Sequence, residues 1–162
     1  MFHYEEKSHI SNLEMLNLNN VDMNEIFESF FEHVSFPELL ELHMSTCNID
    51  YPKFPFLDKI ILPKIQKLDF HHNKFHSIPD DFLKQEYLQV LSLESNLISQ
   101  DIPKTIGHRI QNLKVLNLAH NSLHGDMPES VSSHRFLEML DLSGQLTDND
   151  CDKGHGLTNY YF

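Results

Sequence analysis

Residues 113–131 read LKVLNLAHNSLHGDMPESV, and the spacing of their leucines is the feature that decides the fold. Leu113, Leu116 and Leu118 stand three and then two positions apart, and Asn121 occupies the ninth position of the stretch. An amphipathic helix would repeat every three to four residues and a half-buried strand every two, so neither period alone explains the stretch. A short strand that leads into a turn accounts for both the alternation and the polar residues that follow.

The same pattern recurs along the chain at a regular interval. The formula LxxLxLxxN fits six registers, which begin at Leu13, Leu39, Ile65, Leu88, Leu113 and Leu137. Successive registers are 26, 26, 23, 25 and 24 residues apart, which is the spacing of leucine-rich repeats. Each unit supplies one short strand and cannot bury its apolar side alone, so units must stack. We therefore predict an α/β solenoid, a right-handed leucine-rich repeat superhelix with a parallel β-sheet on its concave face.

The length and composition of the chain allow one repeat array with a real core. Of the 162 residues, 40% are hydrophobic and 10% are aromatic, so a disordered chain is not expected. We expect an N-terminal flank over residues 1–12, a six-unit repeat domain over residues 13–145 and an irregular C-terminal tail over residues 146–162.

Strand alternation divides each unit between a buried and a solvent-facing side. The fourth and sixth positions of the formula should point into the core, as Leu116 and Leu118 do in the opening stretch. The residue between them and the residue after the sixth position should point outward, onto the concave face. Adjacent strands lie ~4.8 Å apart, so these polar side chains should form one surface on which a ligand finds hydrogen bonds. The candidate ligand-binding residues are Asn17, His43, Asp69, His71, Ser92, Glu94, Asn117 and Asp141.

The ninth position carries a second regularity with a structural role. Where the chain leaves the strand, backbone N–H and C=O groups face the interior without a ladder partner, and a buried carboxamide can bond to both kinds. Val21 in the first unit and Gln145 in the last depart from asparagine, so we expect the ends of the array to be frayed, cut or capped. The expected structural ladder consists of Cys47, Asn73, Asn96 and Asn121.

The segments that return the chain between strands differ along the sequence. Residues 24–34, NEIFESFFEHV, place five apolar side chains on one helical stripe with Asn24 at the N-cap, so a helix on the convex side is predicted there. Three later segments, SIPDDFL, QDIPKTI and GDMPESV, each hold a proline after an apolar residue. This order favours an extended or turn conformation before any short helix.

The chain is strongly acidic, which disfavours one class of partner. Twelve Lys and Arg residues stand against twenty-four Asp and Glu, for a formal net charge of -12. Such a surface repels a phosphate backbone, so no nucleic-acid partner is expected. The sequence contains no apolar run long enough to span a membrane, and residues 1–10 lack the apolar stretch of a secretion signal.

Residue groups that could carry chemistry have ordinary structural explanations. His71, His72 and His76 in HHNKFH could suggest a metal site, but strand geometry turns the first two in different directions, and exposed histidines are favoured. Cys47 and Cys151 are too few for a disulfide framework and lack the spacing of a zinc site.

Two further groups also favour a structural role. Cys47 should be buried and inert at the ladder position, and Asp80 and Asp81 are expected to cap a short helix, since carboxylates favour a first turn. The sequence holds no glycine-rich phosphate loop, nucleophile elbow or zinc-ligand motif. We therefore expect no enzyme activity, no metal and no cofactor.

Several stretches resemble a known plant family. Residues 102–106, IPKTI, and residues 125–131, GDMPESV, look like the plant-specific repeat LxxLxLxxNxLxGxIPxxL, in which the Gly and the apolar-Pro pair form a second strand-like layer. Residues 42–79, from LHMSTCNI to FHSIP, resemble the wording of plant receptor-like proteins, which are cell-surface immune and developmental receptors without a kinase domain. Over residues 13–145 this resemblance implies an extracellular recognition domain that binds a peptide, protein or carbohydrate ligand on its concave side. A partner kinase for signalling and a parent at the plasma membrane or outside the cell are implied with it.

Some features of that family are missing from the chain. It has no paired-cysteine N-terminal cap, no transmembrane segment and no N-x-S/T sequon, so it reads as an internal piece of such a receptor or as a truncated relative. Two other hypotheses stay open. One is an intracellular, cytoplasmic leucine-rich repeat adaptor or immune-sensor segment that docks to a neighbouring domain; the other is an inactive gene fragment.

Overall fold

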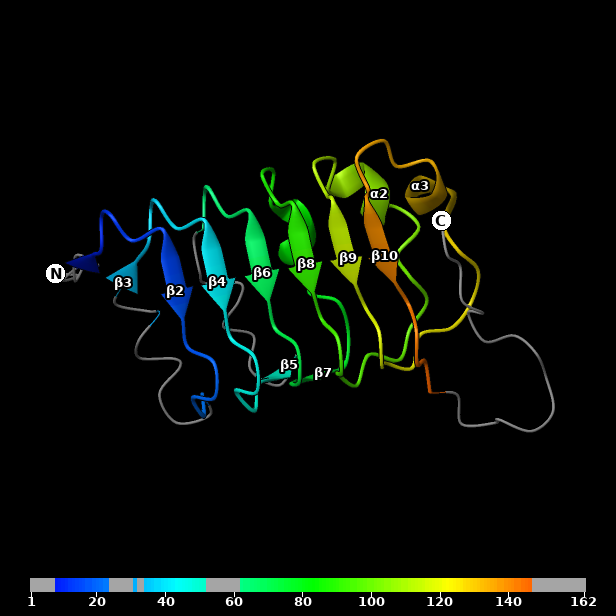
Figure 1. Cartoon of the computed structure of the whole chain (residues 1–162), viewed down its shortest axis with the longest axis horizontal. Helices are drawn as coiled ribbons and strands as arrows, with labels where there is room; N and C mark the ends of the chain where they lie inside the picture. Colours follow the sequence, from blue (N-terminus) through cyan, green and yellow to red (C-terminus); the bar gives the residue numbers. More distant parts are fainter. Residues whose placement is uncertain (1–7, 24–30, 32–33, 52–61, 147–162) are drawn as a thin grey trace, which may run out of the picture.

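The structure, a computed structural model, describes residues 8–23, 31, 34–51 and 62–146. Six short strands lie side by side along the long axis of an elongated solenoid and form one parallel sheet (Figure 1). In the order in which they pair, the strands are β2 (Met15–Asn17), β4 (Glu41–His43), β6 (Lys67–Asp69), β8 (Val90–Ser92), β9 (Val115–Asn117) and β10 (Met139–Asp141). The predicted α/β solenoid with a parallel sheet is confirmed.

The strand register follows the repeat spacing. Leu42 is aligned with Leu68, and Leu91 with Leu116, so each central leucine stands beside the central leucine of the next unit. The residue after each leucine is aligned in the same way from β2 to β10. Insertions of different length between strands are therefore absorbed in the return segments, and the sheet itself stays regular.

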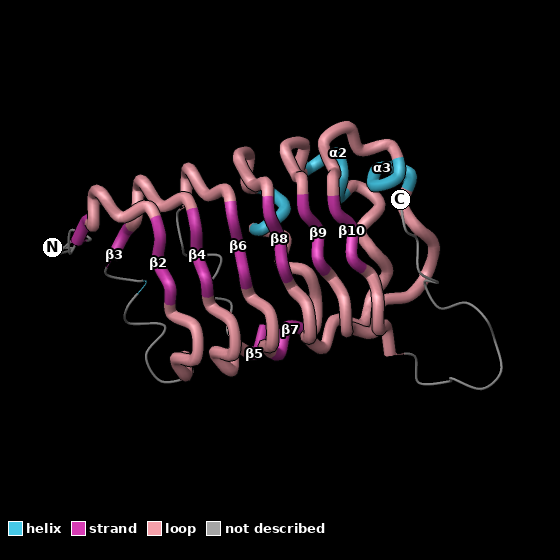
Figure 2. The backbone as a smooth tube through the Cα atoms, in the orientation of Figure 1, coloured by secondary structure: helices cyan, strands magenta, loops and turns pink. Residues whose placement is uncertain are grey.

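Short elements occupy the remainder of each turn. Figure 2 shows the main strands joined by long loops, with the helical turns near β8, β9 and β10. The small parallel pairs are β1 (Ser8–His9) with β3 (Val34–Ser35) and β5 (Asp50–Tyr51) with β7 (Lys74–Phe75), and the helical turns are η2 (Phe82–Lys84), α2 (Ile106–Arg109) and α3 (Glu129–Ser132). No helix in these described ranges has the length and apolar composition needed to cross a membrane.

The helix predicted over residues 24–34 falls mostly outside the described residues. Phe31 is helical and 2% exposed. Val34, which the apolar pattern assigned to this helix, belongs to β3 instead and is aligned with Ser8 of β1. At Val34, pairing with the N-terminal strand decides the backbone conformation, and apolar periodicity alone does not report such pairing.

The short helix α3 follows an extended segment at proline, as the sequence predicts for GDMPESV. Pro128 has φ -64° and ψ 137°, an extended conformation, directly before α3. Asp81 occupies the N-cap of η2, but its φ of -72° and ψ of -27° are helical and its side chain makes no cap bond. The expected capping by the acidic pair is therefore wrong. Asp81 Oδ1 accepts a hydrogen bond from Lys84 Nζ at 2.6 Å, and Asp80 Oδ1 accepts one from Arg109 Nη1 at 2.8 Å.

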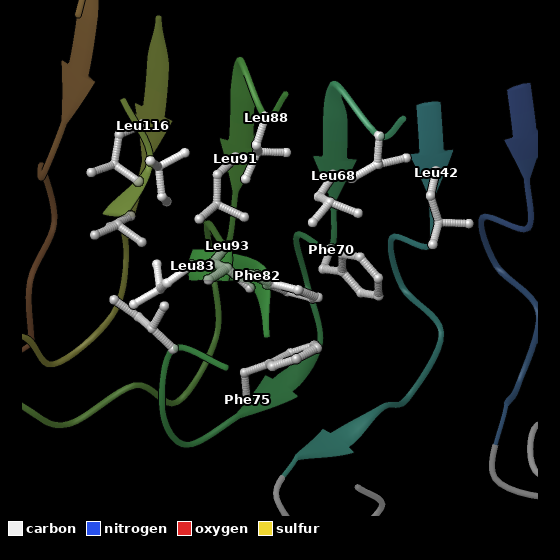
Figure 3. Packing of buried hydrophobic residues seen from close by; sticks show 14 of the residues in the cluster. Leu42, Leu68, Phe70, Phe75, Phe82, Leu83, Leu88, Leu91, Leu93 and Leu116 are labelled. Atoms are coloured by element: carbon white, nitrogen blue, oxygen red, sulfur yellow. The ribbon is translucent and has the colours of Figure 1, made fainter. Parts of the chain in front are cut away.

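One apolar core runs the length of the solenoid. The strand leucines project into it in a row, and phenylalanines fill the space between the row and the return segments (Figure 3). The Phe70 ring meets Phe75 edge-on at 5.6 Å and lies 5.0 Å from Phe82 of η2, arrangements that aromatic pairs favour. The row consists of Leu42, Leu68, Leu91 and Leu116, each at most 1% exposed.

Buried asparagines tie each turn to its neighbour. Asn96 Oδ1 accepts a hydrogen bond from the Phe75 N–H at 3.0 Å. Its Nδ2 donates to the carbonyl oxygens of Phe70, Leu93 and Glu94 at 2.9–3.2 Å. One carboxamide therefore serves backbone groups of two adjacent units that would otherwise be buried without a partner. Equivalent bonds are made by Asn73 and Asn121.

Two other side chains continue this ladder. Gln145 reproduces the asparagine bonds with a longer arm: Oε1 accepts from the Leu123 N–H at 2.9 Å, and Nε2 donates to two carbonyl groups. Cys47 Sγ donates to the Leu18 carbonyl at 3.0 Å. A thiol is a poor acceptor, and in the turn before it the Met23 N–H bonds to the Cys47 backbone carbonyl at 3.0 Å. Gln145 departs from the asparagine of the formula, yet it extends the ladder to the last described unit.

The residue before each ladder position has a left-handed backbone. This conformation turns the chain sharply at the end of each strand and is costly for a β-branched residue such as Thr46. Five of the six are not glycine, although Asn and His, three of the six, adopt this conformation more readily than most residues. The residues are Asn20, Thr46, His72, Ser95, His120 and Gly144, with φ between 53° and 64°.

Leu93→Ala should strongly destabilise the chain. Leu93 is 0% exposed, so truncation leaves a cavity that costs about 2 to 5 kcal/mol. Leu97 lies in the same unit but is 50% exposed, so Leu97→Ala should change the free energy of unfolding by no more than ~0.5 kcal/mol. Urea unfolding followed by circular dichroism compares the two variants. Equal costs would mean that the inward and outward positions are wrongly assigned.

Asn96→Ala should cost about 1 to 3 kcal/mol, because the backbone groups it serves stay buried without partners. The matched control is Asn112→Ala: Asn112 is exposed, its amide reaches only the Glu86 carbonyl, and its loss should cost ~0.5 kcal/mol or less. Native-state hydrogen exchange should also show the Phe75 amide exchanging faster in Asn96→Ala. If that amide stays as protected as in the wild type, the ladder role is refuted.

Candidate functional site

The outward side of the six-stranded sheet presents three rows of side chains. We call the residue before each central strand leucine the first row, the residue after it the second row, and the residue two positions further on the third row. The first row is Met15, Glu41, Lys67, Val90, Val115 and Met139; the second is Asn17, His43, Asp69, Ser92, Asn117 and Asp141; the third is Asn19, Ser45, His71, Glu94, Ala119 and Ser143. The sequence-based candidates are the whole second row with His71 and Glu94, and the register brings them onto one face.

Charged side chains of β4 and β6 form a connected network on this face. His43 lies between two carboxylates, with Nε2 3.0 Å from Glu41 Oε2 and Nδ1 3.5 Å from Asp69 Oδ2. His71 Nδ1 lies 2.6 Å from Asp69 Oδ1, and Lys67 Nζ lies 3.7 Å from Glu41 Oε2. The hydrogen bond from His43 lowers the pKa of Glu41, and the charge of Lys67 adds to this effect. The acidic groups in this half of the face therefore already have N–H or cationic partners.

The face changes character over β8, β9 and β10. Val90 and Val115 are half-buried and Met139 is 51% exposed, and the register aligns them into one apolar strip of the first row. On the other side of the second row, Asn117 Nδ2 donates to Glu94 Oε2 at 2.9 Å. The concave face thus has a half in which ionisable side chains bond to one another and a half in which an apolar strip runs beside neutral polar and acidic groups.

Asparagine and aspartate in the second row also shape the turns. Their side-chain oxygen accepts the backbone N–H two residues later at 3.0–3.4 Å, as in an Asx turn. This bond is made by Asn17, Asp69, Asn117 and Asp141. Asp141 Oδ1 accepts in addition from the Ser143 hydroxyl at 2.7 Å. The Ser143 N–H first, and then its hydroxyl, hold the pKa of Asp141 below its usual range.

The histidines singled out in HHNKFH point to different places. His71 turns to Asp69 on the concave face, whereas His76 Nε2 lies 3.6 Å from Asp50 Oδ1. His72, with its left-handed backbone, is exposed and stacks edge-on against His71 at 5.2 Å. Within the described ranges, no three His, Cys, Asp or Glu side chains are grouped so that they could hold a metal ion.

The two cysteines also differ in their surroundings. Cys47 is buried at 0% exposure, and desolvation raises the pKa of its thiol, which keeps it protonated and unreactive at neutral pH. Cys151 lies outside the described residues.

A separate hollow of about 620 Å³ lies away from the sheet, beside α2 and α3. Its lining includes acidic and basic side chains, among them Asp101, Lys104 and Asp126. Asp101 is engaged with His124, whose Nδ1 lies 2.6 Å from its Oδ1. No side chain of the three concave rows lines this hollow, so it is a different surface from the candidate site.

The first row is absent from the sequence-based candidates, although a signal for it exists. Alternation places the residue before a buried strand leucine on the same side as the residue after it. Glu41 and Lys67 could therefore have been assigned to the concave face directly. The contacts of Glu41 with His43 and with Lys67 could not, because side-chain orientation within a row depends on the neighbouring side chains.

Family comparison agrees with the repeat spacing. Two family models, both described as leucine rich repeat, match residues 64–85 and residues 86–146. Together they cover just over half of the chain.

Two relatives belong to different kinds of protein. Receptor-like protein 14 of Arabidopsis thaliana is 34% identical over 83 residues, which are 50% of this chain and 8% of that protein. The adenylate cyclase of Schizosaccharomyces pombe is 29% identical over 131 residues, which are 81% of this chain and 7% of that protein. The chain thus spans less than a tenth of the length of either relative.

Two solved structures have a similar fold. The leucine-rich repeat ectodomain of the receptor kinase SOBIR1 from Arabidopsis thaliana is 30% identical with a TM-score of 0.51, over 67% of this chain and 57% of that one. The ectodomain of the Arabidopsis receptor kinase HAESA, in complex with an extended IDA peptide hormone, is 29% identical with a TM-score of 0.51, over 70% of this chain and 18% of that one.

Asp141→Asn should weaken the fold in a pH-dependent way. Because the pKa of folded Asp141 lies below its unfolded value, the ionised carboxylate stabilises the chain above about pH 4 and loses this contribution as pH falls through the folded pKa. The variant should therefore be less stable than the wild type at neutral pH, and the gap should close in acid. Thermal unfolding across this pH range measures it. The stability difference caused by Asp141→Asn at neutral pH should be smaller in a Ser143→Ala background and unchanged in a Ser132→Ala background. A difference that grows in acid would contradict the predicted direction.

Proposed function

Because this chain belongs to the leucine-rich repeat family and is of the plant type, we propose that it is a non-enzymatic recognition module of a receptor-like protein. Its ligand, a peptide, protein or carbohydrate, binds across the concave face. The observation that carries the proposal is the register of β2 to β10, which lines up the second row as one polar track over six strands. An extended ligand on this track meets a new set of polar groups at each strand, about every 4.8 Å.

A peptide or protein is the ligand class we favour. The HAESA ectodomain, which shares the fold at 29% identity, binds a peptide hormone. The concave face here is a shallow track of half-buried side chains, and an extended backbone can use many separated hydrogen-bonding groups at once. A compact small molecule gains most from an enclosed pocket instead.

We propose no catalytic role for the chain. The candidate groups on the concave face bond to one another or to turn backbone, and the buried Cys47 thiol has a raised pKa. The match to an adenylate cyclase covers 7% of that enzyme, so its catalysis is not carried over to this chain.

In the whole receptor, we propose that ligand binding recruits a partner kinase, since the relative is a receptor-like protein and both similar structures are receptor-kinase ectodomains. The role would be in defence or developmental signalling, with the parent at the plasma membrane.

A second candidate function is structural docking within a larger intracellular protein. The adenylate cyclase relative favours it, because its match extends over 81% of this chain. In this case the partner surface need not be the concave face, and the acidic rows would be an ordinary solvated side of the sheet.

The test of the proposal is selection of binders from an unbiased library of short peptides displayed on phage, with the full chain as bait. Selected peptides are then measured against Ser92→Arg, which places a long side chain in the middle of the second row. Ser99→Arg is the matched control, since Ser99 is exposed in the same unit and outside the three rows. We expect Ser92→Arg to weaken binding roughly tenfold or more, which is at least about 1.4 kcal/mol, and Ser99→Arg to leave it unchanged.

Circular dichroism establishes that both variants keep the fold. If every selected peptide binds both variants as well as the wild type, the concave face is not the binding surface. If a bound peptide then slows hydrogen exchange only for backbone amides around α2 and α3, the docking role is favoured.

A further inference from the structure

The carboxylates of the concave face have different partners along its length. Over β4 and β6, Glu41 and Asp69 are engaged by His43, His71 and Lys67 at 2.6–3.7 Å. A ligand that binds this half must compete with contacts that are already made. A charged group on the ligand therefore adds little binding free energy over β4 and β6.

Over β8 to β10 the acidic groups have neutral partners. Glu94 accepts from the Asn117 amide at 2.9 Å, and Asp141 accepts from the N–H and the hydroxyl of Ser143 at 3.0 and 2.7 Å. Neither carboxylate forms an ion pair with another residue of the described ranges. A neutral donor leaves the negative charge uncompensated, so both remain available to a cation.

Lys67 is aligned with Val90 in the first row and lies 3.7 Å from Glu41 Oε2; the other charged groups near this half lie around the three rows. Lys114 and Glu138, both exposed, directly precede the first-row residues of β9 and β10 and carry opposite charges. His120 is exposed in the turn after β9, and its positive charge, when present, acts on Asp141. Lys114 and Glu138 together add no net charge. The two carboxylates therefore make the net charge of this half of the face negative.

The apolar strip lies opposite these carboxylates across the second row. Val90, Val115 and Met139 occupy the first row, whereas Glu94 belongs to the third row. Asp141 lies in the second row and is held toward the third by its bonds to Ser143. The ligand surface here is thus apolar along one margin and acidic along the other.

We propose that this half of the face binds an extended peptide in which aliphatic residues alternate with lysine or arginine. An extended chain that crosses the strands over the second row sends successive side chains to opposite sides. Aliphatic side chains then lie on the strip of Val90, Val115 and Met139, and cationic ones reach Glu94 and Asp141. Three strands span about 10 Å, which is the length of roughly three extended residues. This ligand class rests on the proposed function of the concave face and specifies the chemistry that the site selects.

The test uses three synthetic peptides with blocked ends and a fluorescent label: Val-Lys-Val-Lys-Val, its charge-inverted form Val-Glu-Val-Glu-Val, and its polar form Ser-Lys-Ser-Lys-Ser. Fluorescence anisotropy with the full chain gives their affinities. We expect the first peptide to bind most tightly and its affinity to fall as salt is raised, because exposed charges are screened. Equal binding of the polar form would remove the apolar strip from the proposal, and tighter binding of the acidic form would overturn it.

The residues are tested with a charge-matched pair of double variants. Glu94→Gln with Asp141→Asn removes the two carboxylates but keeps an oxygen at each acceptor position. Glu86→Gln with Glu129→Gln removes the same charge from exposed positions outside the three rows. The first pair should weaken binding of Val-Lys-Val-Lys-Val roughly 3- to 30-fold, and the second less than about twofold. Equal weakening by both pairs would mean general attraction to an acidic protein and would refute the site.

The phage selection separates this inference from the function on which it rests. If the selected peptides are blocked by Ser92→Arg but carry no excess of lysine or arginine, the concave face binds ligands and the cationic class is wrong. If no selected peptide is blocked by Ser92→Arg, the concave-face function itself is wrong. If cationic, aliphatic-rich peptides dominate the selection and lose affinity in Glu94→Gln with Asp141→Asn, both hold.

Discussion

The asparagine ladder is the interaction on which the other features of the solenoid depend. At the end of every strand the chain must turn while its backbone N–H and C=O groups are still buried, and such groups are costly without partners. A carboxamide both donates and accepts, so one side chain such as Asn96 joins the backbone of two successive units. Gln145 reproduces both roles with a longer arm, whereas the Cys47 thiol supplies only the donor.

Because the ladder fixes the turn, it also fixes the register of the sheet. Each strand has only three residues, too few to specify pairing by themselves, and the left-handed residue before each ladder position sets where the strand ends. The outward rows inherit this alignment. A functional surface on such a sheet needs no special loop, because stacking of equivalent positions already brings residues from six distant parts of the sequence side by side.

Structure and recognition share side chains on the concave face. Asp69, Asn117 and Asp141 each accept a backbone N–H of the following turn with one side-chain oxygen. Their other polar side-chain atoms remain for contacts on the concave face. The two halves of the face then differ in the partners that their carboxylates have. Over β4 and β6, the carboxylates bond to two imidazoles and lie near the Lys67 ammonium, whereas over β8 to β10 their hydrogen-bond partners are amide, backbone N–H and hydroxyl groups. Proposed selectivity for a cationic, aliphatic-rich peptide follows from this difference rather than from the overall acidity of the chain.

The sequence by itself determined the period, the strand positions and which side chains point into the core, because stacking forces every unit to repeat one apolar pattern. It also identified the second row, since alternation within a strand is a local property. Tertiary structure decided the contacts that the pattern does not encode. Val34 joins β3 because an N-terminal strand pairs with it, and Asp81 binds Lys84 because its backbone is already helical. Gln145 completes the ladder because the preceding turn presents the Leu123 N–H within its reach. His43 meets Asp69 only once β4 and β6 are aligned. The Asp81–Lys84 contact is local to η2. Each of the other contacts depends on the position of a neighbouring unit, and that position is set by packing and hydrogen bonding across units rather than by any residue within one.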